Sequence, residues 1–179
     1  MRTLYIDKNR CYNKYSQRET GDNKSFHLKG ERIMEQLVQH LNVFLSNVAV
    51  LHRKLQNYHW NITGPHFFTL HKKLEEYYEQ ANEDVDVVAE EILKLQGQPF
   101  ATMESYLKAA TLKEPGNKKV TVEEVVSDLL ADFEAMKKEI IAIKEEAEDK
   151  KVYEVSTMAD DFIAEYSKTL WMLRQAYRE

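Results

Sequence analysis

Residues 58 to 91 contain side chains of the types that bind transition metals, at a spacing that could bring them together. His71 and Glu75 stand four residues apart, and so do Asp86 and Glu90. In an α-helix, residues i and i+4 lie on one face about one turn apart, so each pair can direct two ligand atoms at one cation. Imidazole and carboxylate together suit iron, manganese or zinc. The spacing therefore predicts two metal-binding pairs, provided that the segment is helical.

The segment from residue 69 to residue 95 is predicted to form that helix. Its apolar residues recur at steps of three and four, the period of a helix with one buried face. Gly97 then predicts the end of the helix. The recurring residues are Leu70, Leu74, Tyr77, Ala81, Val85, Val88, Ile92 and Leu95.

The two pairs lie too far apart along one helix to surround a single ion. Eleven residues separate Glu75 from Asp86, which is close to three turns, so both pairs share a stripe but stand roughly 16 Å apart. A second copy of the helix, antiparallel across a two-fold axis near Gln80, would place His71 opposite Asp86 and Glu90. Such an isologous dimer would hold two identical sites.

The alternative interpretation is that these pairs form a solvated polar face, because i,i+4 polar pairs are common on helix surfaces. Two pairs in phase, with His59 a short distance upstream, weaken this alternative without removing it. Taken alone, His59 at the end of a helix and Trp60 beside it would be structural residues.

Three further amphipathic segments predict the rest of an all-α fold. The first helix is expected over residues 31 to 61, the third long helix opens at a capping box of Thr121 and Glu124, and the fourth covers residues 152 to 177. Thr102 is expected to cap a short helix over residues 103 to 110. Four long helices, with this short one between the second and third, predict a ferritin-like four-helix bundle.

Several common functional motifs are absent from the sequence. No histidine has a glutamate three positions before it, so the Glu-x-x-His pattern of an iron site inside one bundle is missing. There is also no Walker loop, dinucleotide fingerprint, zincin motif or cysteine cluster. These absences favour the shared interface site.

Composition predicts one domain over residues 31 to 179, preceded by an extension. The chain has 179 residues, of which 43% are hydrophobic, enough for a sizeable core. The single Cys11 excludes an internal disulfide and predicts a cytoplasmic protein, with nucleoid association as a further possibility. No apolar run or signal core predicts contact with a membrane.

Residues 1 to 30 form a basic leader on an acidic chain. They carry seven Lys and Arg against three Asp and Glu, a balance of +4, and the chain total of −5 leaves −9 for the remainder. Basic arms often contact phosphate, which predicts sequence-independent binding of double-stranded DNA. The alternative is a solubilising flexible tail. The candidate DNA contacts are Arg2, Lys8, Arg10, Lys14, Arg18 and Lys24.

The segment NYHWNITGPHFFTLHKKLEEYYEQANEDVDVVAEE resembles the Dps family of mini-ferritins, the DNA-binding proteins of starved cells. The combination of HW, a Gly-Pro turn, FFTLH and a downstream D-x-x-x-E carries the resemblance. It implies that the catalytic iron ligands, shared between subunits, are His59, His71, Asp86 and Glu90. Glu75 falls on a further metal-binding position that is usually Asp, and Trp60 falls beside the iron site.

The resemblance also implies an activity and an assembly. A Dps protein would be a homododecameric shell that oxidises Fe(II) at a two-iron site, with hydrogen peroxide as oxidant, and stores the ferric mineral; zinc could substitute at the site. Some family members bind DNA through basic N-terminal extensions. The alternative function is a nucleoid-packaging protein whose metal site is vestigial or holds zinc without turnover.

Overall fold

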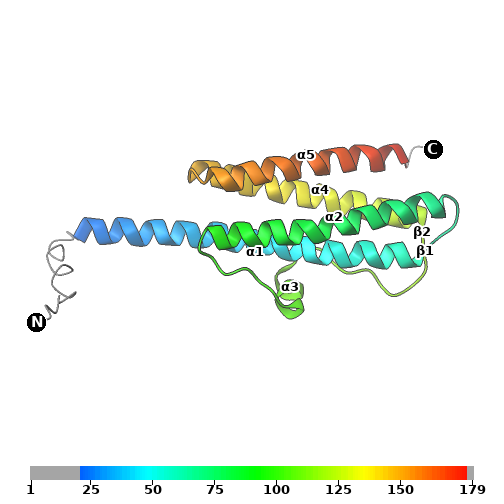
Figure 1. Ribbon diagram of the computed structural model, residues 1–179, viewed down its shortest axis with the longest axis horizontal. Helices are drawn as coiled ribbons and strands as arrows, with labels where there is room; N and C mark the ends of the chain where they lie inside the picture. The colour runs from blue at the N-terminus through cyan, green and yellow to red at the C-terminus, as the bar shows by residue number, and fades with distance from the viewer. Residues whose placement is uncertain (1–20, 177–179) are drawn as a thin grey trace, which may run out of the picture. The chain divides into compact units, whose positions relative to one another are not determined.

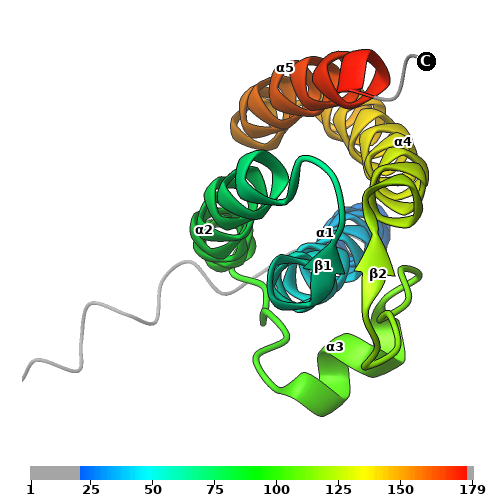
Figure 2. The same ribbon diagram turned by 90° about the vertical axis from the view of Figure 1, so that its right-hand side faces the viewer.

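The computed structural model describes the backbone of residues 21–176 and the side chains of residues 34–176 (Figure 1). The described chain is almost entirely helical, with one very short sheet, which confirms the predicted all-α, ferritin-like fold. Figure 2 shows four long helices side by side around a common centre, with the short α3 outside them. The elements are α1 (Gly21–Asn61), β1 (Ile62–Thr63), α2 (Phe67–Lys94), α3 (Met103–Ala109), β2 (Val120–Thr121), α4 (Val122–Asp149) and α5 (Tyr153–Ala176).

Helix α1 is longer than the sequence pattern predicts. The described part of the chain is already helical at Gly21, so the predicted start near residue 31 is wrong. No proline falls in this segment, and extending an existing helix adds one hydrogen bond for each residue fixed, so polar residues can continue it. The helix therefore runs through residue 30, at which the sequence predicts that the basic leader ends. The division into a leader (residues 1 to 30) and a bundle domain (residues 31 to 179) stays a prediction.

The two short strands tie the end of α1 to the start of α4. They pair in parallel, with Ile62 opposite Val120 and Thr63 opposite Thr121. Ile62 and Val120 are both buried, so the pairing closes this end of the core. Two-residue strands leave no periodic pattern, which explains why the sequence did not predict them.

Two predicted helix caps are confirmed. The Thr121 hydroxyl accepts from the backbone N–H of Glu124 at 3.2 Å, and the Glu124 carboxylate accepts from the Thr121 N–H at 2.8 Å. This reciprocal capping box opens α4. At α3, the Thr102 hydroxyl accepts from the Ser105 N–H at 3.2 Å.

Helix α2 ends at Lys94, shortly before Gly97, which predicted its end. Gln96 takes the left-handed conformation, with φ of 60°, and its N–H bonds to the Leu93 carbonyl. The Gly97 N–H bonds to the Ile92 carbonyl at 2.9 Å, completing a Schellman-type end. Gly97 is needed for space, because a Cβ there would lie 2.7 Å from a methyl group of Val38.

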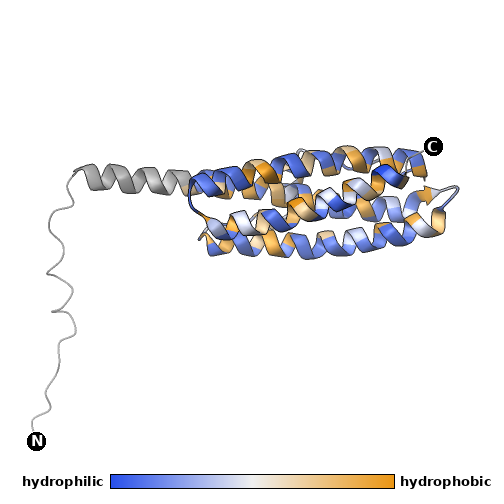
Figure 3. Ribbon diagram, turned by 90° about the horizontal axis from the view of Figure 1, so that it is seen from above, coloured by the Kyte–Doolittle hydropathy of each residue, from blue (hydrophilic) through white to orange (hydrophobic). Residues whose placement is uncertain are grey.

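The bundle interior is apolar with a few paired polar groups. Figure 3 shows hydrophobic and hydrophilic residues interspersed along every long helix, as expected for helices with one buried face. Lys54 is 3% exposed, and its Nζ lies 2.5 Å from Asp128 Oδ2 and 2.6 Å from Asp132 Oδ2. Tyr58 donates its hydroxyl to Asp128. None of the helices in the described part of the chain is long and apolar enough to cross a membrane.

Candidate metal centre

His59, in the last turn of α1, and His71, near the start of α2, hold each other in a reciprocal contact. Their rings stack with centroids 3.7 Å apart and an angle of 21° between the planes. The Nδ1 of each ring lies 2.8 Å from the backbone carbonyl oxygen of the other residue. A carbonyl can only accept, so both Nδ1 atoms carry the proton. In the neutral rings, both Nε2 atoms therefore keep a free lone pair for a metal.

Aromatic side chains hold the two imidazoles from both sides. Phe67 stacks on His71 at 4.9 Å between centroids, and Tyr78 meets His59 edge to face at 5.4 Å. His59 is only 8% exposed, while His71 is half-buried. The imidazole pair is therefore oriented before any metal arrives, which lowers the cost of binding one.

The carboxylates lie on α2, as predicted, but at two separate places. Glu75 stands one turn after His71, is half-buried, and accepts a hydrogen bond of 3.3 Å from the Tyr78 hydroxyl. Asp86 and Glu90 lie about three turns further on, and both are exposed. Within residues 34–176 of one chain, no three His, Cys, Asp or Glu side chains converge as a metal site. One chain thus carries two separate candidate half-sites, neither of them complete by itself.

Three large apolar side chains near the candidate ligands are exposed in one chain. Trp60, next to His59, is 57% exposed. On α2, Val87 follows Asp86 directly and is 45% exposed, and Leu93 lies three residues after Glu90 and is 56% exposed. Exposed apolar residues interspersed with candidate ligands are typical of a surface that another protein chain covers.

The other described histidines do not join the candidate centre. His66 caps α2 in a left-handed conformation, is exposed, and makes no side-chain cap bond. His40 pairs with Glu146 at 2.5 Å, which links α1 to α4. His52 is half-buried beside Tyr78, and burial lowers its pKa.

Sequence reasoning missed Phe67 and Tyr78, which contact the imidazole pair. Tyr78 stands three residues after Glu75, a helical spacing at which side chains meet, so its contact with that carboxylate had a signal in the sequence. Phe67 stands four residues before His71, also a helical spacing, but the sequence pattern predicts a helix that begins only at residue 69, which leaves Phe67 outside it.

The proposed DNA contacts Arg2, Lys8, Arg10, Lys14 and Arg18 lie outside the described residues. Lys24 falls on α1, but the structure does not describe its side chain.

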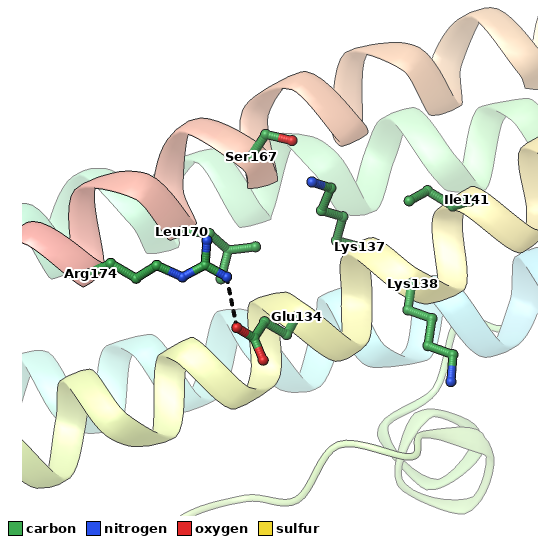
Figure 4. A pocket seen from close by; sticks show the side chains of 7 residues that line it. All are labelled: Glu134, Lys137, Lys138, Ile141, Ser167, Leu170 and Arg174. Atoms are coloured by element: carbon green, nitrogen blue, oxygen red, sulfur yellow. Dashed lines mark hydrogen bonds and ion pairs between the residues drawn. The ribbon is translucent and has the colours of Figure 1, made fainter.

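A separate pocket of about 270 Å³ lies between α4 and α5 (Figure 4). Arg174 bonds to Glu134 at 2.9 Å across it, and Lys137 points into the space toward Ser167. Its lining holds three cationic side chains and one carboxylate among seven residues, so it does not suit a metal cation.

Comparison with known proteins agrees with this fold. The ferritin-like domain model matches residues 17–179. A "DNA protection during starvation protein" of Brevibacillus brevis is 37% identical over 133 residues, covering 74% of this chain and 89% of that protein. The crystal structure of a Dps protein from Bacillus brevis matches with a TM-score of 0.80 and 34% identity, over 82% of this chain and 98% of that chain.

A Dps protein from Vibrio cholerae O1, described as a member of a broad superfamily of ferritin-like diiron-carboxylate proteins, matches with a TM-score of 0.79 and 32% identity. That match covers 82% of this chain and 92% of the other. The chain therefore belongs to the Dps family of ferritin-like proteins.

Proposed function

We propose that this protein oxidises Fe(II) and stores the ferric product at sites shared between two copies of the chain. His59, His71 and Glu75 of one copy would face Asp86 and Glu90 of the other. The observation that carries the proposal is the reciprocal His59–His71 contact, which leaves both Nε2 atoms free for a metal. The diiron-carboxylate description of the Vibrio cholerae relative supports iron as the substrate.

The chemistry of the side chains fits this role. Two imidazoles and three carboxylates bind iron, and the hard carboxylate oxygens stabilise Fe(III) more than Fe(II), which favours loss of an electron. With hydrogen peroxide as oxidant, one peroxide accepts an electron from each of two Fe(II) ions and, with two protons, leaves as two waters. Trp60 would be covered by the second chain and would shield the site from water.

The shared site is best tested by mixing two inactive chains. His71→Ala and Asp86→Ala should each abolish rapid Fe(II) oxidation, because each variant lacks half of every site. In a mixed dimer, the His71→Ala chain still supplies Asp86 and the Asp86→Ala chain still supplies His71. These two residues meet in one of the two sites, which is intact, while the other site lacks both. Random co-assembly should therefore recover about a quarter of the wild-type oxidation rate, as two-fold symmetry requires.

A chain carrying both substitutions is the matched control, because mixing it with either single variant restores no site. No recovery in the co-assembled single variants would overturn the shared site. Full activity of either single variant alone would overturn the assignment of its residue. Native mass measurement of each preparation shows whether the particles still assemble.

We also propose that the chains close into a homododecamer of twelve times 21.1 kDa, roughly 250 kDa. The exposed Trp60, Val87 and Leu93 support burial of this face by another copy. A stable monomer or dimer at micromolar concentration, with no larger species, would contradict this assembly.

DNA protection in the cytoplasm, with association with the nucleoid, is a second proposed role. Its support is the +4 leader and the name of the Brevibacillus brevis relative. Several arms on one particle would engage a duplex together and gain avidity, with strong salt dependence and no sequence preference. The rival function is DNA packaging with a vestigial or zinc-occupied metal site.

The described extent of α1, Gly21–Asn61, guides the DNA experiment. Deleting residues 1–20 removes five of the six candidate contacts and keeps all of this described helix, whereas deleting residues 1–30 would remove part of it. Gel-shift titration with unrelated duplexes should show loss of binding after the deletion, while Fe(II) oxidation persists. Lys24→Gln in the full chain tests the remaining contact. Equal retardation by the truncated protein would place the DNA contact elsewhere.

A further inference from the structure

We infer that Tyr78 is a positioning residue that holds the Glu75 carboxylate at the imidazole half-site. This inference rests on the proposed iron-oxidising function and adds a residue to it. Tyr78 contacts two candidate ligands on two different helices: its hydroxyl donates to Glu75 Oε1 at 3.3 Å, and its ring meets His59 edge to face at 5.4 Å. No other described side chain is hydrogen-bonded to the Glu75 carboxylate.

Glu75 needs such a restraint because its side chain is long and only half-buried. A glutamate loses substantial rotamer freedom when it is fixed, and a metal that binds a free glutamate must supply that entropy. A hydrogen bond from Tyr78 to Oε1 restricts the carboxylate in advance and leaves Oε2 free to bind. Hydrogen bonds to ligating carboxylates commonly raise metal affinity in this way.

The ring of Tyr78 is half-buried and packs against the core, while its hydroxyl can be removed by substitution with phenylalanine, which keeps the ring. The residue also borders an open hollow of about 700 Å³, which His52 and Glu79 line as well. Tyr78→Phe keeps the edge contact with His59 and deletes only the donor to Glu75. Tyr77→Phe is the matched control, because the ring of this adjacent tyrosine meets Phe133 edge to face rather than a candidate ligand.

The experiment is a Co²⁺ titration of the assembled full-length protein, followed by visible absorption and calorimetry. Tyr78→Phe should weaken Co²⁺ binding about tenfold and change the d–d absorption bands, whereas Tyr77→Phe should match wild type. In Fe(II) oxidation, the same substitution should raise KM more than it lowers kcat, because it disturbs ligand placement.

Glu75→Asp adds a second comparison. The shorter aspartate side chain does not reach the Tyr78 hydroxyl from the same backbone position. Tyr78→Phe should therefore have an effect of less than about twofold in the Glu75→Asp background, as a double-mutant cycle of a direct contact requires. An undiminished tenfold effect in that background would overturn the inference.

The possible failures are distinguishable. If wild type binds Co²⁺ and Tyr78→Phe binds it equally well with unchanged absorption bands, the positioning role is overturned and the proposed function stands. If assembled wild type binds no Co²⁺ at the histidine half-site, which His71→Ala identifies, the proposed function falls and the role of Tyr78 falls with it.

Discussion

His59 and His71 orient each other through two hydrogen bonds of equal length, each from the Nδ1 of one ring to the backbone carbonyl of the other residue. The contact joins the last turn of α1 to the first turns of α2 across the intervening turn. Each imidazole thus positions the other, and in the proposed site each would also be a ligand. Loss of one ring should therefore disturb both.

His59→Phe separates ligand loss from loss of packing. Phenylalanine can keep the stack on His71 and the contact with Tyr78, but it provides neither the Nε2 ligand nor the Nδ1 donor. We expect the particle to assemble and Zn²⁺ affinity, measured by calorimetry, to fall at least about tenfold. His66→Phe, at an exposed position, should leave the affinity unchanged. Wild-type affinity in His59→Phe would remove His59 from the site.

Lys54→Met should destabilise the protein by about 3–5 kcal/mol, because it leaves the carboxylates of Asp128 and Asp132 without their buried cation. The urea midpoint at fixed subunit concentration measures the change. Adding Asp132→Asn should recover part of the loss. Lys73→Met is the control, since its pair with Glu76 lies at the surface, where ion pairs contribute little to stability. Similar losses from both lysine variants would contradict this account.

Gln96→Gly should stabilise the protein by about 1 kcal/mol. Gln96 has a φ of 60°, in the left-handed region. This backbone conformation is unfavourable for a residue that has a Cβ atom, whereas glycine adopts it at almost no cost in free energy. Thermal unfolding of the assembled protein measures the effect. A lower melting temperature would show that the Gln96 side chain contributes more than its backbone strain costs.

Gly97→Ala, one residue further on, should have the opposite effect. The new Cβ would lie 2.7 Å and 2.8 Å from the two Val38 methyl groups, so α1 and the end of α2 must separate. We expect a loss of about 1–3 kcal/mol, as for an overpacked core. Val38→Ala should relieve the clash in the double variant, and failure of that rescue would point to a different cause.

Glu139→Gln should change the pH dependence of stability. Burial raises the pKa of Glu139, partly offset by the hydrogen bond of 2.7 Å from Asn47 and by the charge of His40. The folded state therefore keeps the proton to higher pH than the unfolded chain, and the stability contributed is lost as pH rises through the folded pKa. Glutamine can accept the same Asn47 bond without ionising.

We therefore expect Glu139→Gln to match wild type below the ordinary glutamate pKa of 4.5 and to be more stable at about pH 8. Urea midpoints across this range provide the measurement. Glu145→Gln, exposed on the same helix, is the control. A variant less stable than wild type at about pH 8 would show that the charged carboxylate stabilises the fold.

The sequence by itself determined the helical architecture and the position of the carboxylates along it. Apolar residues at steps of three and four specify a helix that buries one face, and this period fixed α2, α4 and α5 to within a few residues. The Thr121 and Glu124 capping box is a local interaction, so the sequence could also reveal it. The same periodicity placed His71, Glu75, Asp86 and Glu90 on one helix.

Tertiary structure alone decided how those side chains are presented. Which nitrogen of His59 and His71 is free depends on carbonyl groups that meet only when α1 and α2 pack together. The requirement for glycine at position 97 likewise comes from Val38 on another helix. The extra turns of α1 before residue 31 have no amphipathic pattern to reveal them, because a polar helix can extend by backbone hydrogen bonds alone. Contacts between distant segments have no period in the sequence, and the candidate site depends on such contacts.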